Sequence, residues 1–140
     1  MAKIKKSGIA LAILCFVACF LYVTSGNRPR YLGDGFYFSS TNEFNKHIWY
    51  WRLFDKEHED IGVPPCVLSY RNTHRFILVM QKPRKFDDII DIHYTYPQGR
   101  DSDYFWIVIK KEKIIIGPMS KEKMVACQDS LLIPARLQIR

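Results

Sequence analysis

The sequence lacks the residue patterns that usually identify an enzyme or a metal site. It contains four histidines, and no two of them stand at the spacing of metal ligands. It has no glycine-rich phosphate loop, no nucleophile elbow and no paired-aspartate motif. The polar run 57–60 (EHED) could bind a metal only if the loop folded around the ion, so we interpret it as a solvated loop. We therefore expect no metal and no cofactor, and we favour a non-enzymatic role over an enzyme built from residues distant in the sequence.

Cysteine is scarce after the N-terminal segment, where only Cys66 and Cys127 remain. In an oxidising compartment these two residues could form a disulfide, which in principle stabilises a fold by about 4 kcal/mol for a loop of this size. The alternative is that each thiol is a small buried apolar group. Cys127 lies between Met124 and Leu131 on the apolar stripe of an expected helix, and this position favours the alternative.

Neither sign of charge dominates the chain after its N-terminal segment. Three of the 21 basic residues lie in that segment, so the remainder carries 18 basic against 14 acidic residues. Such a surplus suits solubility or contact with anionic lipid. It is too small and too dispersed for a nucleic-acid-binding protein, so we expect no nucleic-acid partner.

The N-terminal segment, residues 1–26, has a basic start followed by a long apolar run. Three lysines precede residues 9–23, which contain no charged residue, and this layout is typical of an export signal or a membrane anchor. Residues 7–24 would form a helix of about 27 Å, at the short end of a single membrane span. The lysines predict a cytoplasmic N-terminus and a domain on the extracytoplasmic side.

Two other interpretations of this segment stay open. The sequence Val17-Ala18-Cys19 resembles the lipobox of bacterial lipoproteins, in which the cysteine is acylated after cleavage, although Phe16 replaces the usual leucine. Ordinary cleavage is the third interpretation. Bulky apolar residues at 20–23 extend the run past a usual cleavage site and favour an uncleaved anchor. Both the anchor and the lipidated Cys19 would tether the chain to a membrane.

The rest of the chain predicts one domain of the α+β class. Residues 27–35 are a polar connector, and residues 36–140 have the length of a single domain. We expect a small antiparallel β-meander sheet of five to six strands followed by one C-terminal helix, which Ser120 caps after Gly117-Pro118 ends the last strand. The strand expected at 44–54 is apolar on both faces, which predicts that both are covered. Strands are expected at 36–38, 44–54, 67–70, 75–81, 104–111 and 114–116.

The connection from Lys82 to Asp103 is the candidate binding surface. It has about 20 residues, and loops of that length in compact domains are often functional. Charges of both signs alternate in blocks along it. The candidate binding residues are Lys82, Arg84, Lys85, Asp87, Asp88, Tyr94, Tyr96 and Arg100.

Three groups of segments carry a resemblance to known proteins. They are residues 63–70 with 76–81, residues 104–109, and residues 116–120 with 132–134 and Leu137. Together they resemble a family of small exported bacterial domains, often lipoproteins, whose function is unassigned. The resemblance covers roughly residues 60–140 and implies a fold and an exported location, but no reactive residues.

We therefore expect a membrane-tethered extracytoplasmic domain that binds another protein or stabilises an envelope assembly. An immunity protein against a membrane-active or periplasmic toxin is a narrower form of this hypothesis. The alternative is a small-ligand or glycan binder, or an enzyme, that uses the 82–103 loop and an aromatic sheet face. Exposed rings of Trp49, Trp51, Tyr94 and Tyr96 would suit stacking on sugars, so buried rings or the lack of a pocket beside the loop would count against it.

Overall fold

The computed structural model of the chain describes residues 13–17, 28–41, 45–52, 61–83 and 94–137. Residues 13–17 are helical, and within the described ranges no helix is long and apolar enough to cross a membrane. Most of the anchor expected at residues 7–24, and Cys19 with it, lies outside the described residues.

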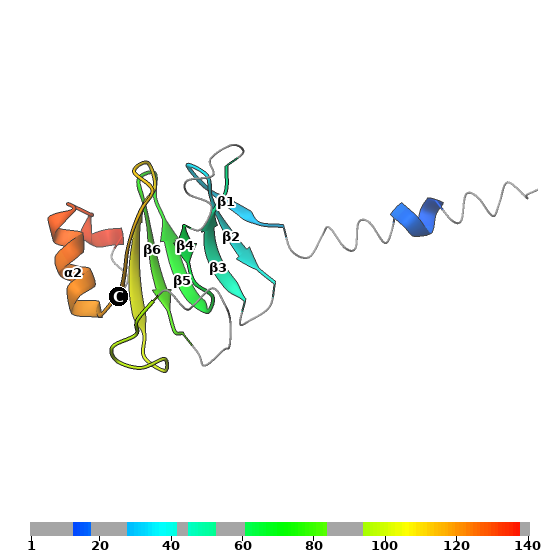
Figure 1. Cartoon of the computed structure of the whole chain (residues 1–140). Coiled ribbons are helices and arrows are strands. Elements are labelled where there is room, and N and C mark those ends of the chain that lie inside the picture. The colour runs from blue at the N-terminus through cyan, green and yellow to red at the C-terminus, as the bar shows by residue number, and fades with distance from the viewer. Residues whose placement is uncertain (1–12, 18–27, 42–44, 53–60, 84–93, 138–140) are drawn as a thin grey trace, which may run out of the picture.

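The described residues form eight strands in two antiparallel sheets of four (Figure 1). The N-terminal sheet has the order β1-β2-β3-β4, and the C-terminal sheet has the order β5-β6-β7-β8. Helix α2 (Lys121–Ser130) and a short 3-10 helix (Ala135–Leu137) follow. The strands are β1 (Arg30–Gly33), β2 (Phe36–Ser40), β3 (Lys46–Tyr50), β4 (Gly62–Val63), β5 (Val67–Asn72), β6 (Phe76–Gln81), β7 (Tyr104–Ile109) and β8 (Ile114–Met119).

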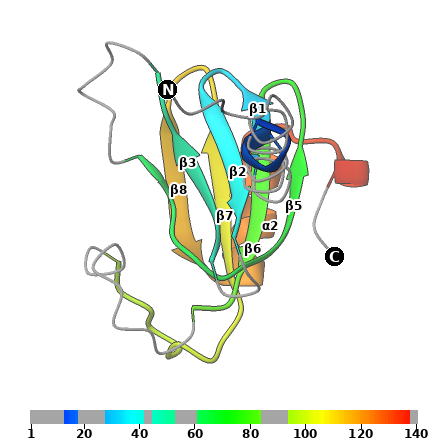
Figure 2. The same cartoon turned by 90° about the vertical axis from the view of Figure 1, so that its right-hand side faces the viewer.

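The two sheets and α2 make three layers, with the C-terminal sheet in the middle (Figures 1 and 2). One core lies between the sheets and includes Phe36, Ile48 and Trp106. A second core lies between the C-terminal sheet and α2 and includes Leu78 and Met124. The antiparallel strands and the C-terminal helix were predicted, but the single sheet of five to six strands was wrong. β1 and β4 were not predicted, because strands of four and two residues are too short to show an alternation of apolar and polar residues in the sequence.

Alternation along β6 and β7 explains why the C-terminal sheet is the middle layer. Successive side chains of a strand point to opposite faces. Ile77 and Val79 therefore face the N-terminal sheet, whereas Phe76 and Leu78 face α2. All six residues of β7 are buried, so this strand is covered on both faces.

The prediction of two covered faces was wrong for the strand at 44–54. β3 spans only Lys46–Tyr50, and Ile48 and Tyr50 are buried against the C-terminal sheet. Trp49 is half-buried and Trp51 is 48% exposed, because the N-terminal sheet is an outer layer. Phe44, Leu53 and Phe54 lie outside the described residues.

The hairpin predicted across residues 67–81 is confirmed as β5 and β6. The last strand differs from its prediction, because β8 continues through Gly117 and Pro118 to Met119. Gly117 has a φ of 148°, and a Cβ there would lie 2.6 Å from Cε3 of Trp106, so the close packing requires glycine. Proline is tolerated because β8 is an edge strand of its sheet.

The predicted cap of the C-terminal helix is confirmed, since Ser120 Oγ accepts a hydrogen bond from the Lys123 N–H at 3.4 Å. The possible disulfide is not formed, because Cys66 and Cys127 are both free. Cys127 packs at the edge of the core under α2, and Cys66, which is buried beside β5, is not part of that core. The thiols therefore act as separate small apolar groups.

Candidate functional site

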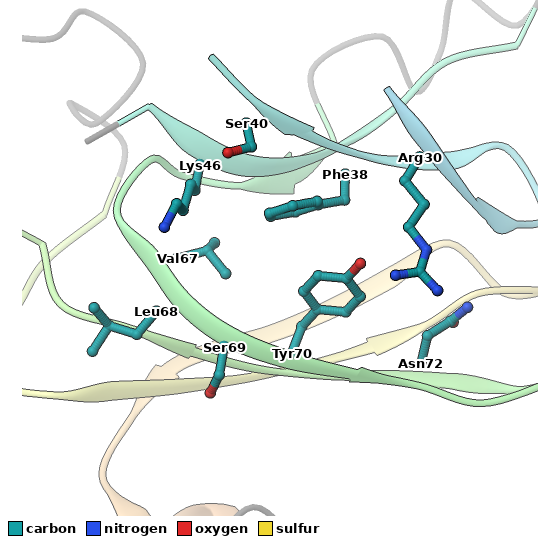
Figure 3. A pocket seen from close by; sticks show the side chains of 9 residues that line it. All are labelled: Arg30, Phe38, Ser40, Lys46, Val67, Leu68, Ser69, Tyr70 and Asn72. Carbon is teal, nitrogen blue, oxygen red and sulfur yellow. The ribbon is translucent and has the colours of Figure 1, made fainter. Parts of the chain in front are cut away.

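A cavity of about 600 Å³ opens between the N-terminal sheet and β5 (Figure 3). One wall comes from the first three strands and the other from the edge strand of the C-terminal sheet. Phe38, Val67 and Tyr70 join the cavity to the core between the sheets. The lining residues are Arg30, Phe38, Ser40, Lys46, Val67, Leu68, Ser69, Tyr70 and Asn72.

The strand register of the N-terminal sheet brings the polar members of this wall together. Arg30 stands opposite Phe38 in the β1–β2 pair, and Ser40 stands opposite Lys46 in the β2–β3 pair. These positions continue the inward-facing alternation of the buried residues Leu32, Phe36 and Ile48. The inner face therefore changes from apolar to basic where the cavity begins.

The cavity is positively charged and has an aromatic centre. Arg30 and Lys46 are its two charged lining residues, and among the described residues no carboxylate pairs with either. Between them the rings of Phe38 and Tyr70 pack with centroids 4.7 Å apart (Figure 3). A site of this kind fits a ligand that carries negative charge beside apolar groups.

Lys110 connects the two walls of the cavity by hydrogen bonds at the end where Asn72 lies. Its side chain is only 3% exposed, and its Nζ donates to the Leu32 carbonyl at 2.8 Å and to Asn72 Oδ1 at 3.2 Å. The lysine thereby ties β1 to β5 and orients the Asn72 side chain that lines the cavity. Burial lowers the pKa of the Lys110 ammonium, and the nearby Asp34 carboxylate partly offsets this shift. Lys110 was not among the predicted site residues, although alternation along β7 places position 110 on the same face as Trp106 and Val108.

The free energy of unfolding is expected to rise with pH between the lowered pKa of Lys110 and the ordinary lysine value of 10.5. In that interval the unfolded chain holds a proton that the folded chain has released, so stability increases as pH rises. Urea unfolding of the wild type and Lys110→Met, from about pH 7 to about pH 10, measures this. The free energy of unfolding of the wild type minus that of Lys110→Met should grow with pH. A difference that stays constant with pH would contradict the prediction.

Tyr94 acts in the opposite direction, because burial raises the pKa of its hydroxyl above 10.0. The folded chain then holds the Tyr94 proton longer than the unfolded chain, which lowers stability at the alkaline end. Since both proteins contain Tyr94, this contribution cancels in the difference.

The predicted binding loop does not line this cavity at the residues that the structure describes. Lys82 is half-buried, and Tyr96 and Arg100 pack together near the start of β7, with the guanidinium 5.4 Å from the ring centroid. Tyr94 contacts Trp106 edge to face at 4.9 Å, and its hydroxyl donates to the Gly62 carbonyl at 3.4 Å. The remaining predicted residues, Arg84, Lys85, Asp87 and Asp88, lie outside the described residues.

The aromatic residues proposed for sugar stacking are not brought together. Trp49 stacks on Tyr37 of the outer sheet face, with ring centroids 5.3 Å apart. Tyr94 instead packs on the core residue Trp106, and Tyr96 packs on Tyr104. A cavity of about 350 Å³ does lie beside the end of the loop, where Gln98 and Asp103 line it, but it contains none of these four rings. The cavity between the sheets is therefore the candidate binding site.

No cluster of three His, Cys, Asp or Glu residues that could hold a metal ion occurs within the described ranges. A family model with the description "Protein of unknown function (DUF3997)" matches residues 34–140. The match runs from the turn before β2 to residue 140. The predicted resemblance to a family of unassigned function covered roughly residues 60–140, and the match begins earlier, at residue 34. No curated protein and no solved structure matches the chain.

Proposed function

The chain belongs to the family described as "Protein of unknown function (DUF3997)", and we propose that it is a membrane-tethered extracytoplasmic domain that binds another protein without catalysing a reaction. The observation that carries the proposal is the basic cavity between the two sheets. The basic start and apolar run of residues 1–26 support the tether and the extracytoplasmic location.

The composition of the cavity favours binding over catalysis. General acid–base chemistry near neutral pH usually needs a histidine or a carboxylate, and covalent chemistry often uses a cysteine or an activated serine. None of the described lining residues is a histidine, a carboxylate or a cysteine. What the cavity does provide is two cations, an aromatic pair and the edge of a strand, which are features of recognition sites.

The partner is expected on the extracytoplasmic side of the membrane. An envelope assembly and a toxin neutralised by an immunity protein both fit such a domain. A toxin gene next to the gene of this chain would identify the immunity role.

Mild crosslinking in the native host, followed by affinity capture of the detergent-extracted full-length chain, is expected to recover a stoichiometric protein partner. Recovery should fall about tenfold in the double variant Arg30→Gln/Lys46→Gln, because two charge-assisted contacts are lost. The matched control, Lys111→Gln/Lys123→Gln, removes two exposed lysines that do not line the cavity and should keep full recovery.

Recovery of the wild-type chain without any partner would contradict the proposed function. Intact mass of the recovered chain reports the tether in the same experiment. A mass that begins at Met1 identifies an uncleaved anchor, and a mass that begins at an acylated Cys19 identifies a lipoprotein. An unacylated chain cleaved after the apolar run would contradict the tether.

A further inference from the structure

We infer that the protein partner binds as an extended acidic segment that adds, as a fifth strand, to the free edge of β5. The inference rests on the proposed function, and it specifies how the partner is recognised. Three features of the cavity support it, namely the strand edge that forms one wall, the length of that edge without proline, and the placement of the cations on the opposite wall.

The edge of β5 lines the cavity with its main chain. Five of the six residues of β5 line it, Val67 to Tyr70 and Asn72. Val67 and Tyr70 both pack on the core between the sheets although they are three positions apart, since the register shift between Val67 and Ser69 interrupts the alternation of side chains there. Figure 3 shows the Ser69 hydroxyl on the side of β5 away from Phe38, so Ser69 contributes its main chain. The cavity therefore runs along the strand edge.

That edge is unpaired within the part of the chain that the structure describes. β5 pairs with β6 on one side, and no described strand pairs with its other side. An edge strand carries alternating N–H and C=O groups that can pair with an added strand. Leu68 is 49% exposed, and Ser69 and Asn72 are also exposed, so the edge is accessible to a partner.

β5 is also the most suitable of the four described edge strands. β4 has two residues, and β1 has four residues with a register shift. β8 contains Pro118 and a register shift, and proline removes a backbone donor. β5 has six residues without proline; its pairing with β6 shifts register between Val67 and Ser69 and is regular from Ser69 to Asn72. β5 is therefore the longest of these edges that has no proline.

The charges on the opposite wall specify an acidic segment. Arg30 stands opposite Phe38 and Lys46 stands opposite Ser40, and these two positions are two residues apart on β2. Side chains two residues apart on a strand share one face. Arg30 and Lys46 flank β2 on its two sides, so acidic side chains that share the inward face of the added strand would face the wall that carries both cations.

The test uses the full-length chain in mild detergent and a defined probe, an eight-residue fluorescent peptide of alternating glutamate and valine. Its affinity, measured by fluorescence anisotropy, is expected to exceed that of the same peptide with glutamine in place of glutamate by about tenfold. The double variant Arg30→Gln/Lys46→Gln should remove this difference, and the control Lys111→Gln/Lys123→Gln should keep it. Circular dichroism of each variant checks that it remains folded.

Two N-methylated peptide series test strand addition itself. In an added strand, alternate N–H groups point to β5 and the others point away. Methylation of one alternate set should weaken binding about tenfold or more, and methylation of the other set should leave it unchanged. Equal effects of the two sets, equal binding of the glutamine peptide, or binding of inorganic phosphate without binding of the peptide would each overturn the inference.

These outcomes separate the inference from the proposed function. If capture recovers a partner that binds the wild type and the cavity double variant equally, protein binding stands and recognition of an acidic segment by Arg30 and Lys46 fails. If capture recovers no partner but the peptide binds with the alternating N-methyl pattern, the recognition mode stands and the proposed function fails.

Discussion

Replacement of Gln81 with methionine is expected to lower the free energy of unfolding by about 2–4 kcal/mol. Gln81 is fully buried, and both polar atoms of its side chain are hydrogen-bonded. Its Nε2 donates to the carbonyls of Pro65 at 2.7 Å and Pro64 at 3.3 Å, and its Oε1 accepts from Trp106 Nε1 at 2.8 Å. Methionine has a similar volume but leaves these three groups without their partner, and each unsatisfied buried group costs about 1–3 kcal/mol before relaxation.

Urea unfolding followed by tryptophan fluorescence measures this loss. Gln98→Met is the matched control, because Gln98 is exposed and its side chain takes part in none of the described hydrogen bonds. The control is expected to change stability by less than about 0.5 kcal/mol. A change of the same small size in Gln81→Met would show that the buried network does not stabilise the fold.

Replacement of Gln128 with methionine is expected to have the opposite sign and to raise the free energy of unfolding by about 1–3 kcal/mol. Gln128 is also fully buried, on the side of α2 that faces the C-terminal sheet near Met124. Within the described part of the chain, neither its Nε2 nor its Oε1 has a hydrogen-bond partner. Methionine removes both polar atoms at similar volume, and its helix propensity is close to that of glutamine.

The same unfolding experiment measures the gain. Gln128→Asn serves as the comparison, because it keeps a buried amide and shortens the side chain, and it is expected to lower stability. The backbone carbonyl of residue 128 accepts from the Ile133 N–H at 2.9 Å in every variant, so the end of α2 is unaffected. A loss of stability in Gln128→Met would indicate that the amide is satisfied in solution.

These two glutamines lie in different cores, on opposite sides of the C-terminal sheet. Trp106, which bonds Gln81, belongs to the core between the sheets, and Met124, beside Gln128 on α2, belongs to the core under the helix. Since sites without shared partners act independently, the double variant is expected to show the sum of the two changes within about 0.5 kcal/mol.

Local patterns in the sequence determined the elements that depend on local physics. Alternation and turn residues predicted the hairpin of β5 and β6 and the strand β7, and the Ser120 hydroxyl predicted the start of α2. Each of these features depends on residues a few positions apart, so a short window of sequence contains the whole signal.

The arrangement of those elements was decided by contacts between distant residues. The split into two sheets depends on pairings that no local pattern encodes, and it made the N-terminal sheet an outer layer in which Trp51 is exposed. Composition and loop length directed the site prediction to residues 82–103. None of the predicted residues that are described there lines the cavity between the sheets.

By itself, then, the sequence determined the strand-rich α+β character of the chain, its C-terminal helix and the lack of a recognisable catalytic motif. Only the tertiary structure decided which cations share a cavity, because Arg30 and Lys46 meet β5 through packing between sheets. It also decided the different roles of two glutamines that no sequence pattern distinguishes. The physical reason is that burial and hydrogen bonding depend on which surfaces come together in space. Those surfaces come from distant parts of the chain, since Arg30 is 16 residues from Lys46 and 42 residues from Asn72, and all three line the cavity.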